Sequence, residues 1–268
     1  MKKNIKKACD EYEKMILDAT EYTGNTQPEK KIFSASSLGN YPLQNFLKFK
    51  YGSKKSTQFE ANTFGSVYQL GIDSATNSRP EYKLKYTNAM RIKVKLPNGW
   101  TVSGEMDQID WDNEVIFDNK VTTGTAIGKV KTEGKDHQYA LQMGVYKWLL
   151  KEDAIQKEEK VIPFDAVLPM VDKNFSYFKT NKYNQLNFIE VETHSHEEIE
   201  RLLKKATDEL QTFIDLNTEP PKCENTWNFG KKGQRAKPMR CIHYCDVAEH
   251  CKHFNPTDTN VVRELLDL

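Results

Sequence analysis

The chain has 268 residues, of which 38% are hydrophobic and 29% charged, and its net charge is +1, which is typical of a globular protein with a substantial core. No apolar run approaches the ~20 residues that span a bilayer, and the start of the chain lacks the apolar stretch of a secretory signal. We therefore expect no membrane or exported role, a cytoplasmic location, and a DNA-binding surface only as a local patch.

The first predicted elements are helical. Apolar residues at helical spacing predict an amphipathic helix over residues 4–22, followed by a polar loop that ends near Lys31. Ser34 is placed to cap a short helix that runs to Leu38, and residues 58–75 are predicted to form another helix.

Strands and two further helices follow, and the order of all elements predicts the fold class. Three strand-like runs with tight turns between them predict a β-meander, and the turn at Pro97-Asn98-Gly99 is the strongest signal. These runs are residues 86–96, 100–110 and 114–121. The later predicted elements are a helix at 136–151, strands at 164–171 and 188–193, and a helix at 196–216. This order indicates an α/β or α+β fold around a mixed central sheet.

The second and third strands of this meander carry the residues that are most informative about chemistry. If residues 111–114 form the loop between them, Asp107 lies opposite Asp118. The same register sets Glu105 opposite Lys120, and Lys120 shares the face of Asp118. The apolar residues that would face the core on the other side are Met106, Val115, Phe117 and Val121.

Two opposed carboxylates repel each other unless a positive charge lies between them. Oxygen ligands of this kind suit Mg²⁺ or Mn²⁺, which keep several of their waters. A lysine beside such a metal can orient or deprotonate an attacking water, or stabilise charge that develops on a phosphate. The alternative is a solvated hairpin whose Asp and Lys side chains simply face water.

Asp107, followed by Asp118-Asn119-Lys120 at the end of an apolar strand, resembles the core motif of the PD-(D/E)XK nuclease superfamily, and in particular its RecB-like exonuclease branch. The resemblance covers about Ser34 to Cys251. It implies a restriction-endonuclease-like α/β core, with a mixed central sheet flanked by helices. It also implies that Asp107, Asp118 and the backbone carbonyl of Asn119 bind a catalytic Mg²⁺ or Mn²⁺, and that Lys120 assists hydrolysis.

One position in the predicted helix at 58–75 departs from the pattern of this branch. The branch usually carries a histidine four residues after a helix glycine as a metal ligand, whereas Gln69 follows Gly65 here. A glutamine carbonyl coordinates a hard cation but binds transition metals less well than imidazole does. The resemblance therefore implies Gln69 as a further candidate metal ligand.

The predicted helix at 136–151 carries a polar stripe formed by Gln138, Gln142 and Tyr146, which are four residues apart. The run from Gln142 to Tyr146 resembles the Q-x-x-x-Y helix of the same branch, which implies that both residues belong to the catalytic site. Gln138 is a candidate for DNA contact. The alternative is an ordinary amphipathic helix.

Four of the five cysteines cluster near the C-terminus, whereas Cys9 stands apart. Such a cluster in a reducing cytosol predicts a structural metal site rather than free thiols or disulfides. The cysteines of the cluster are Cys223, Cys241, Cys245 and Cys251. Their local spacing allows Zn²⁺, and the family resemblance favours a [4Fe-4S] cluster.

Two groups of basic residues stand out in this nearly neutral chain. The first group lies between two of the clustered cysteines and suits contact with DNA or, equally, a solvated loop. It comprises Lys231, Lys232, Arg235, Lys237 and Arg240. The second group suits protection of a strand edge. It comprises Lys83, Lys85, Arg91, Lys93 and Lys95.

These observations predict three parts: an N-terminal helix and loop at 1–32, a nuclease core at 33–220, and a cysteine-rich, metal-bound tail at 221–268. The resemblance implies a metal-dependent DNA exonuclease, from a bacterium or a phage, that acts in DNA recombination, repair or replication. Its substrate would be DNA, and a helicase, a recombinase or a single-strand-binding protein would be its partner. The alternatives are a catalytically weak DNA-binding adaptor on a nuclease fold, an endonuclease of the same superfamily, and an interaction module built around a zinc-bound tail.

Overall fold

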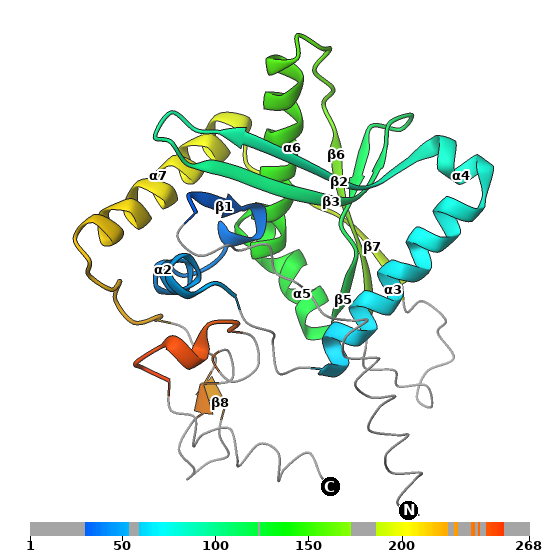
Figure 1. Ribbon diagram of the computed structural model, residues 1–268. Helices are drawn as coiled ribbons and strands as arrows, with labels where there is room; N and C mark the ends of the chain where they lie inside the picture. Colours follow the sequence, from blue (N-terminus) through cyan, green and yellow to red (C-terminus); the bar gives the residue numbers. More distant parts are fainter. Residues whose placement is uncertain are drawn as a thin grey trace, which may run out of the picture. The chain divides into compact units, whose positions relative to one another are not determined.

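The computed structural model describes residues 30–53, 59–122, 124–172, 186–224, 228–229, 237–238, 241 and 245–254 (Figure 1). The helix predicted at 4–22 lies outside these residues. The chain divides into two compact units. The tail unit comprises Met1–Lys30, Pro42–Ser66 and Glu219–Leu268, and the sheet unit comprises Lys31–Tyr41 and Val67–Thr218.

The sheet unit is built on a seven-stranded mixed sheet. Its strands are β1 (Ile32–Ser34), β2 (Tyr86–Lys95), β3 (Thr101–Asp110), β4 (Val115–Phe117), β5 (Lys120–Thr122), β6 (Asp165–Asp172) and β7 (Leu186–Glu190). The order is β1-β3-β4-β6-β5, with β2 paired to β3 and β7 paired to β6. The pairs β1–β3, β4–β6 and β5–β6 are parallel, and β2–β3, β3–β4 and β6–β7 are antiparallel. The predicted α/β fold with a mixed central sheet is confirmed.

Helices flank this sheet, and two glycines allow close packing. The helices are η1 (Ala35–Ser37), α3 (Phe59–Ser78), α4 (Pro80–Lys85), α5 (Gly124–Glu133), η2 (Gly134–Asp136), α6 (Gln138–Gln156) and α7 (His196–Asp215). A Cβ atom added to Gly104 of β3 would lie 2.7 Å from Leu149 and 2.9 Å from the Tyr146 ring, so α6 packs directly on β3. A Cβ atom added to Gly144 would lie 2.6 Å from Ile199, which shows that α7 packs on α6.

The β2–β3 hairpin follows the prediction closely. Gly99 adopts φ +85°, as the predicted turn requires, and the amide of Leu96 donates to the carbonyl of Trp100 at 2.7 Å. Buried Ile92 and Val94 alternate with exposed cations along β2, which is the pattern of a strand with one face on a core.

The third strand of the meander differs from the prediction. Asp110 pairs with Val115, so the four-residue loop is confirmed, but the single strand predicted at 114–121 is divided into β4 and β5. Because β5 pairs with β6, Lys120 lies opposite Met170 and not opposite Glu105.

The predicted core face of β4 is also wrong. Ile116 is fully buried, whereas Val115 and Phe117 are only partly buried. β4 has β3 on one side and β6 on the other. Strands inside a sheet that is covered on both faces carry near-continuous apolar runs, so alternation does not reveal which side chain is most buried.

The longer elements that were predicted from periodicity within the described residues all occur, with ends shifted by a few residues. The helix predicted at 58–75 is α3, the helix at 136–151 is α6 and the helix at 196–216 is α7, while the last two predicted strands are β6 and β7. The elements that the prediction missed include β1, α2 (Pro42–Tyr51), α4 and α5. They have ten or fewer residues each, so few apolar positions mark their period.

In the tail unit, helix α2 packs against residues 245–251, which carry two of the clustered cysteines. The described elements of this unit are α2 (Pro42–Tyr51), β8 (Asn228–Phe229), β9 (Lys237–Pro238) and η3 (Ala248–His250). Asp246 accepts a hydrogen bond from Gln44 at 3.1 Å and pairs with Lys48 at 2.8 Å. The ring of Tyr51 stacks on His250 with centroids 4.3 Å apart, so α2 and residues 245–251 are held together. In the part of the chain that is described, no helix combines the length and apolarity that crossing a membrane requires.

Candidate active site

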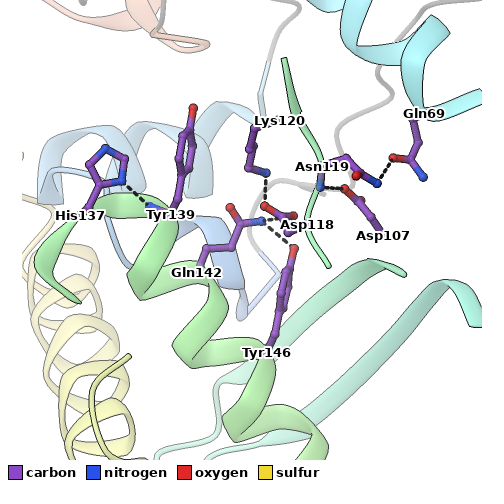
Figure 2. A network of polar contacts seen from close by, with 9 residues as sticks. All are labelled: Gln69, Asp107, Asp118, Asn119, Lys120, His137, Tyr139, Gln142 and Tyr146. Carbon is purple, nitrogen blue, oxygen red and sulfur yellow. Dashed lines mark hydrogen bonds and ion pairs between the residues drawn. The ribbon is translucent and has the colours of Figure 1, made fainter. Parts of the chain in front are cut away.

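Asp107, Asp118 and Lys120 meet at the break between β4 and β5 (Figure 2). The ammonium group of Lys120 forms an ion pair with the Asp118 carboxylate. Asp118 is 2% exposed, and the Lys120 side chain is 20% exposed. The backbone amide of Asn119 donates to Oδ2 of Asp107 at 2.7 Å. The break therefore releases an amide from the strand ladder and directs it at a carboxylate of the neighbouring strand.

The surroundings of Asp107 disfavour its negatively charged form. Burial and the negative charge of Asp118 raise the pKa of Asp107 to about 7, although Lys120 and the Asn119 amide act in the opposite direction. A carboxylate whose pKa is raised in this way favours the approach of either a proton or a cation.

Lys120 keeps its proton at neutral pH. Burial acts to lower the pKa of Lys120, but the charges of Asp118 and Asp107 outweigh it and raise this pKa to about 12. Its Nζ atom also lies 5.2 Å from the centre of the Tyr139 ring, a cation–π distance. Among the predicted roles of Lys120, this environment favours stabilisation of negative charge over deprotonation of water.

Helix α6 supplies Gln142 and Tyr146 to the same place (Figure 2). Nε2 of Gln142 donates to Oη of Tyr146 at 2.6 Å and makes a longer contact of 3.4 Å with Oδ1 of Asp118. Gln138 is exposed at the start of α6, outside the network in Figure 2, and a Cβ atom on Gly39 would lie 2.7 Å from its Cβ.

Helix α3 reaches the site from the other side through Gln69. Its Oε1 accepts a hydrogen bond from the side-chain amide of Asn119 at 3.1 Å, and its Nε2 donates to Asp73 at 3.0 Å. Both ends of the Gln69 amide are therefore engaged, and a metal would compete with Asn119 for its oxygen.

Asp73 and Tyr139 are two residues of the site that the sequence interpretation missed. Burial raises the pKa of Asp73, the hydrogen bond from Gln69 lowers it, and Glu105 raises it further. Asp73 in turn helps to raise the pKa of Asp107. The helical spacing of four residues from Gln69 was the signal for Asp73, whereas no spacing rule places Tyr139 beside Lys120.

The residues present fit a hard divalent cation. Two carboxylates, from Asp107 and Asp118, and the carbonyl of Asn119 offer only oxygen, which suits Mg²⁺ or Mn²⁺. Within the described residues, no three side chains of His, Cys, Asp or Glu are arranged to hold a metal ion. The other ligand positions would therefore fall to water and to substrate oxygens, as these ions commonly allow.

The four clustered cysteines have intermediate exposure, and none of them forms a disulfide with a residue that the structure describes. Burial raises the pKa of Cys245 to about 11, and the charges of Asp246, Cys241 and Cys223 contribute to the shift. Cys241 and Cys223 thus both lie within electrostatic reach of Cys245, although the described residues hold no assembled metal-binding group. Cys9 lies outside the described residues.

The first basic group falls mostly outside the described residues. Lys231, Lys232, Arg235 and Arg240 lie outside the described residues, and Lys237 belongs to β9.

Comparisons with known proteins agree with this fold. The crystal structure of SSO0001 superposes with a TM-score of 0.52 at 13% identity, covering 90% of this chain and 96% of that one, which shows a shared fold. An alkaline exonuclease from Laribacter hongkongensis gives a TM-score of 0.43 at 15% identity, over 70% of this chain and 92% of that one. A phage related exonuclease from Haemophilus somnus 129PT gives 0.42 at 15% identity, over 72% and 97%. A search of curated proteins found no significant match. The family model of the PD-(D/E)XK nuclease superfamily matches residues 42–252, and the chain therefore belongs to this superfamily.

Proposed function

We propose that this protein is a metal-dependent deoxyribonuclease that acts as an exonuclease. The observation that carries the proposal is the meeting of Asp107, Asp118 and Lys120 at one strand break, with Gln142 in contact with Asp118. Two carboxylates and an ammonium group combine a cation site with a charge that can face a phosphate.

Asp107, Asp118 and the carbonyl of Asn119 would hold the Mg²⁺ or Mn²⁺ ion. When bound, the ion would supply an activated water and neutralise charge on the phosphate. Lys120, which stays protonated, would stabilise the negative charge that develops on the phosphoryl oxygens. Gln142 would fix the orientation of the Asp118 carboxylate, and Gln69 would fix Asn119.

The exonuclease assignment rests on the resemblance of the motifs at 118–120 and 142–146 to the RecB-like branch. We place the activity in bacterial or phage DNA recombination, repair or replication. In such a role, a helicase, a recombinase or a single-strand-binding protein would deliver DNA ends to the enzyme.

The test is digestion of linear and of closed-circular DNA with Mg²⁺ or Mn²⁺. We compare the wild type with Lys120→Ala, and with Lys157→Ala as a control that breaks the surface ion pair with Asp153. Loss of linear DNA alone, with the wild type and the control, supports the exonuclease. Cutting of the circles as well indicates an endonuclease. DNA binding without any cutting by the wild type indicates the adaptor, in which the nuclease fold is kept for binding.

A second part of the proposal concerns the tail. We infer that Cys223, Cys241, Cys245 and Cys251 bind a structural Zn²⁺ or a [4Fe-4S] cluster that closes the segment between them. The electrostatic influence of Cys241 and Cys223 on Cys245 supports the inference. Metal analysis and the visible absorption spectrum of protein purified without oxygen distinguish zinc from iron. Cys245→Ser should lose the metal and lower the melting temperature, and unchanged metal content would contradict the inference.

A further inference from the structure

The exposed face of β2 carries a row of cations that the catalytic network does not use. Alternate residues of the strand are buried, so the residues between them project together from the other face. The projecting cations are Arg91, Lys93 and Lys95, all exposed, and the buried residues are Ile92, Val94 and Leu96. Neighbouring cations in this row are about 6.6 Å apart, because a strand rises about 3.3 Å per residue.

The strand register connects this row to the active site. Asn88 pairs with Gln108 and Met90 pairs with Met106, so the residue between them, Ala89, faces Asp107. Ala89 has φ +51°, and the ladder is interrupted at this one position of β2. The row therefore starts two residues from the point opposite Asp107 and continues toward the hairpin turn.

Electrostatics give a second link between the row and the site. Arg91 forms an ion pair with Glu105, which lies opposite it on β3. The charge of Glu105 raises the pKa of Asp73, and Asp73 helps to raise that of Asp107. The first cation of the row thus neutralises an acidic residue at the border of the site.

Among the described residues, the two lysines beyond Arg91 have no such carboxylate partner. Lys93 faces Ser103 and Lys95 faces Thr101, so hydroxyl groups replace the carboxylate. Neither lysine forms an ion pair with any residue that the structure describes. In the described sheet β2 pairs only with β3, and its outer edge is open. Protection of this open edge would explain the presence of lysines on β2. It would not explain why the row of cations begins beside the proposed catalytic carboxylates.

We propose that Arg91, Lys93 and Lys95 bind the phosphodiester backbone of the DNA strand beside the bond that is cut. The proposal rests on the deoxyribonuclease function above. Each phosphate contact releases counterions from the DNA, so the logarithm of the binding constant falls as the logarithm of the salt concentration rises. Loss of two lysines should make this slope less steep by about 1.4 for single strands and by about 1.8 for duplex DNA.

The experiment compares Lys93→Gln/Lys95→Gln with a matched control, Lys204→Gln/Lys205→Gln, which removes the same charge from the exposed side of α7. Binding of a fluorescent DNA oligonucleotide, single-stranded and as duplex, is measured over a range of salt with EDTA to prevent cutting. We expect a less steep salt dependence of DNA binding for Lys93→Gln/Lys95→Gln, the β2 variant, and the wild-type salt dependence for the control. Equal slopes for the β2 variant and the control would overturn the proposal.

Cleavage assays distinguish failure of this proposal from failure of the deoxyribonuclease function on which it rests. The β2 variant should cut long DNA with a raised KM, yet hydrolyse thymidine monophosphate p-nitrophenyl ester at the wild-type rate, because this probe is too short to reach Lys93. An unchanged KM for long DNA would overturn the backbone contact while leaving the nuclease intact. If the wild type cuts neither substrate, the nuclease assignment fails, and the salt slopes still decide whether β2 binds DNA.

Discussion

Lys120 pairs with Asp118 across the two-residue break that separates β4 from β5, and both side chains are largely buried there. The charges of this pair cancel, whereas the other carboxylate of the site, Asp107, has its pKa raised to about 7. The charge of the site is thus unbalanced, with two carboxylates for one ammonium group. This imbalance is the physical reason to expect that a cation binds at the site.

Replacement of Lys120 by Met should abolish cleavage and destabilise the metal-free protein. The 2% exposed Asp118 would lose its ion-pair partner, which costs about 1–3 kcal/mol of unfolding free energy at this partly exposed pair. Thermal unfolding in EDTA and in Mg²⁺ measures the effect, and Mg²⁺ should recover part of the loss because it replaces the missing positive charge. Equal melting temperatures of variant and wild type in EDTA would contradict the importance of this pair.

Replacement of Asp107 by Asn should stabilise the metal-free protein above neutral pH. The folded protein holds the Asp107 proton with a pKa of about 7, above the ordinary value of 3.8. The resulting stability is complete below about pH 4 and is lost as the pH rises through about 7. At pH 8 the variant should gain about 1–2 kcal/mol, or roughly 2–6 °C in Tm.

The pH profile supplies the control for this substitution. At pH 5 the wild-type carboxyl is already protonated, so the difference between the two proteins should shrink. Cleavage should be lost at every pH, because the variant lacks the carboxylate that we propose as a metal ligand. A wild type that is more stable than Asp107→Asn at pH 8 in EDTA would show that Asp107 has a positive partner.

Replacement of Gln69 by Ala should lower cleavage about 10- to 100-fold, the usual effect of removing a residue that orients a ligand. Its bond to Asn119 predicts that the two residues act together. In a double-mutant cycle with Asn119→Ala, the double variant should therefore be little worse than either single variant. Additive losses would indicate that Gln69 acts independently, for example as a metal ligand. Gln211→Ala, which removes a similar side-chain bond to Asp215 on α7, is the control and should keep full activity.

Replacement of Gly104 by Ala should disturb the Tyr146 ring and, through it, Gln142. The added methyl group would lie 2.9 Å from the ring and 2.7 Å from Leu149, and overpacking of this kind costs about 1–3 kcal/mol. We expect a lower Tm and a lower kcat. Gly128→Ala is the matched control, because an added Cβ atom in that exposed turn of α5 meets nothing within 4 Å. It should leave activity unchanged and, since alanine is the better helix former, raise Tm slightly.

The hairpin shows which features a sequence can predict. The turn at Gly99, the four-residue loop and the pairing of Asp110 with Val115 follow from turn chemistry and strand alternation. Turn chemistry and strand alternation are local properties of the sequence, so they could be recognised without any knowledge of neighbouring strands. The helices α6 and α7 were predicted for the same reason, since each is long enough for its apolar period to show.

The break after Phe117 shows what local patterns miss. The prediction continued one strand to Val121, but β6 lies beside both β4 and β5 and takes over the pairing of Lys120. A strand's partner depends on chain that is distant in sequence, here about fifty residues away. The break is nevertheless essential to the site, because it presents the Asn119 amide to Asp107.

The sequence by itself determined the superfamily and the fold class, and it predicted the acidic pair with its lysine, because these depend on residue types at short, fixed spacings. Only the tertiary structure decided that Asp73 and Tyr139 join the site, that the Gln69 amide is engaged by Asn119, and that Lys120 remains protonated. These properties depend on burial and on charges brought together from α3, β3, β5 and α6. A pKa responds to every charge within a few ångströms, and only the folded chain defines which charges those are.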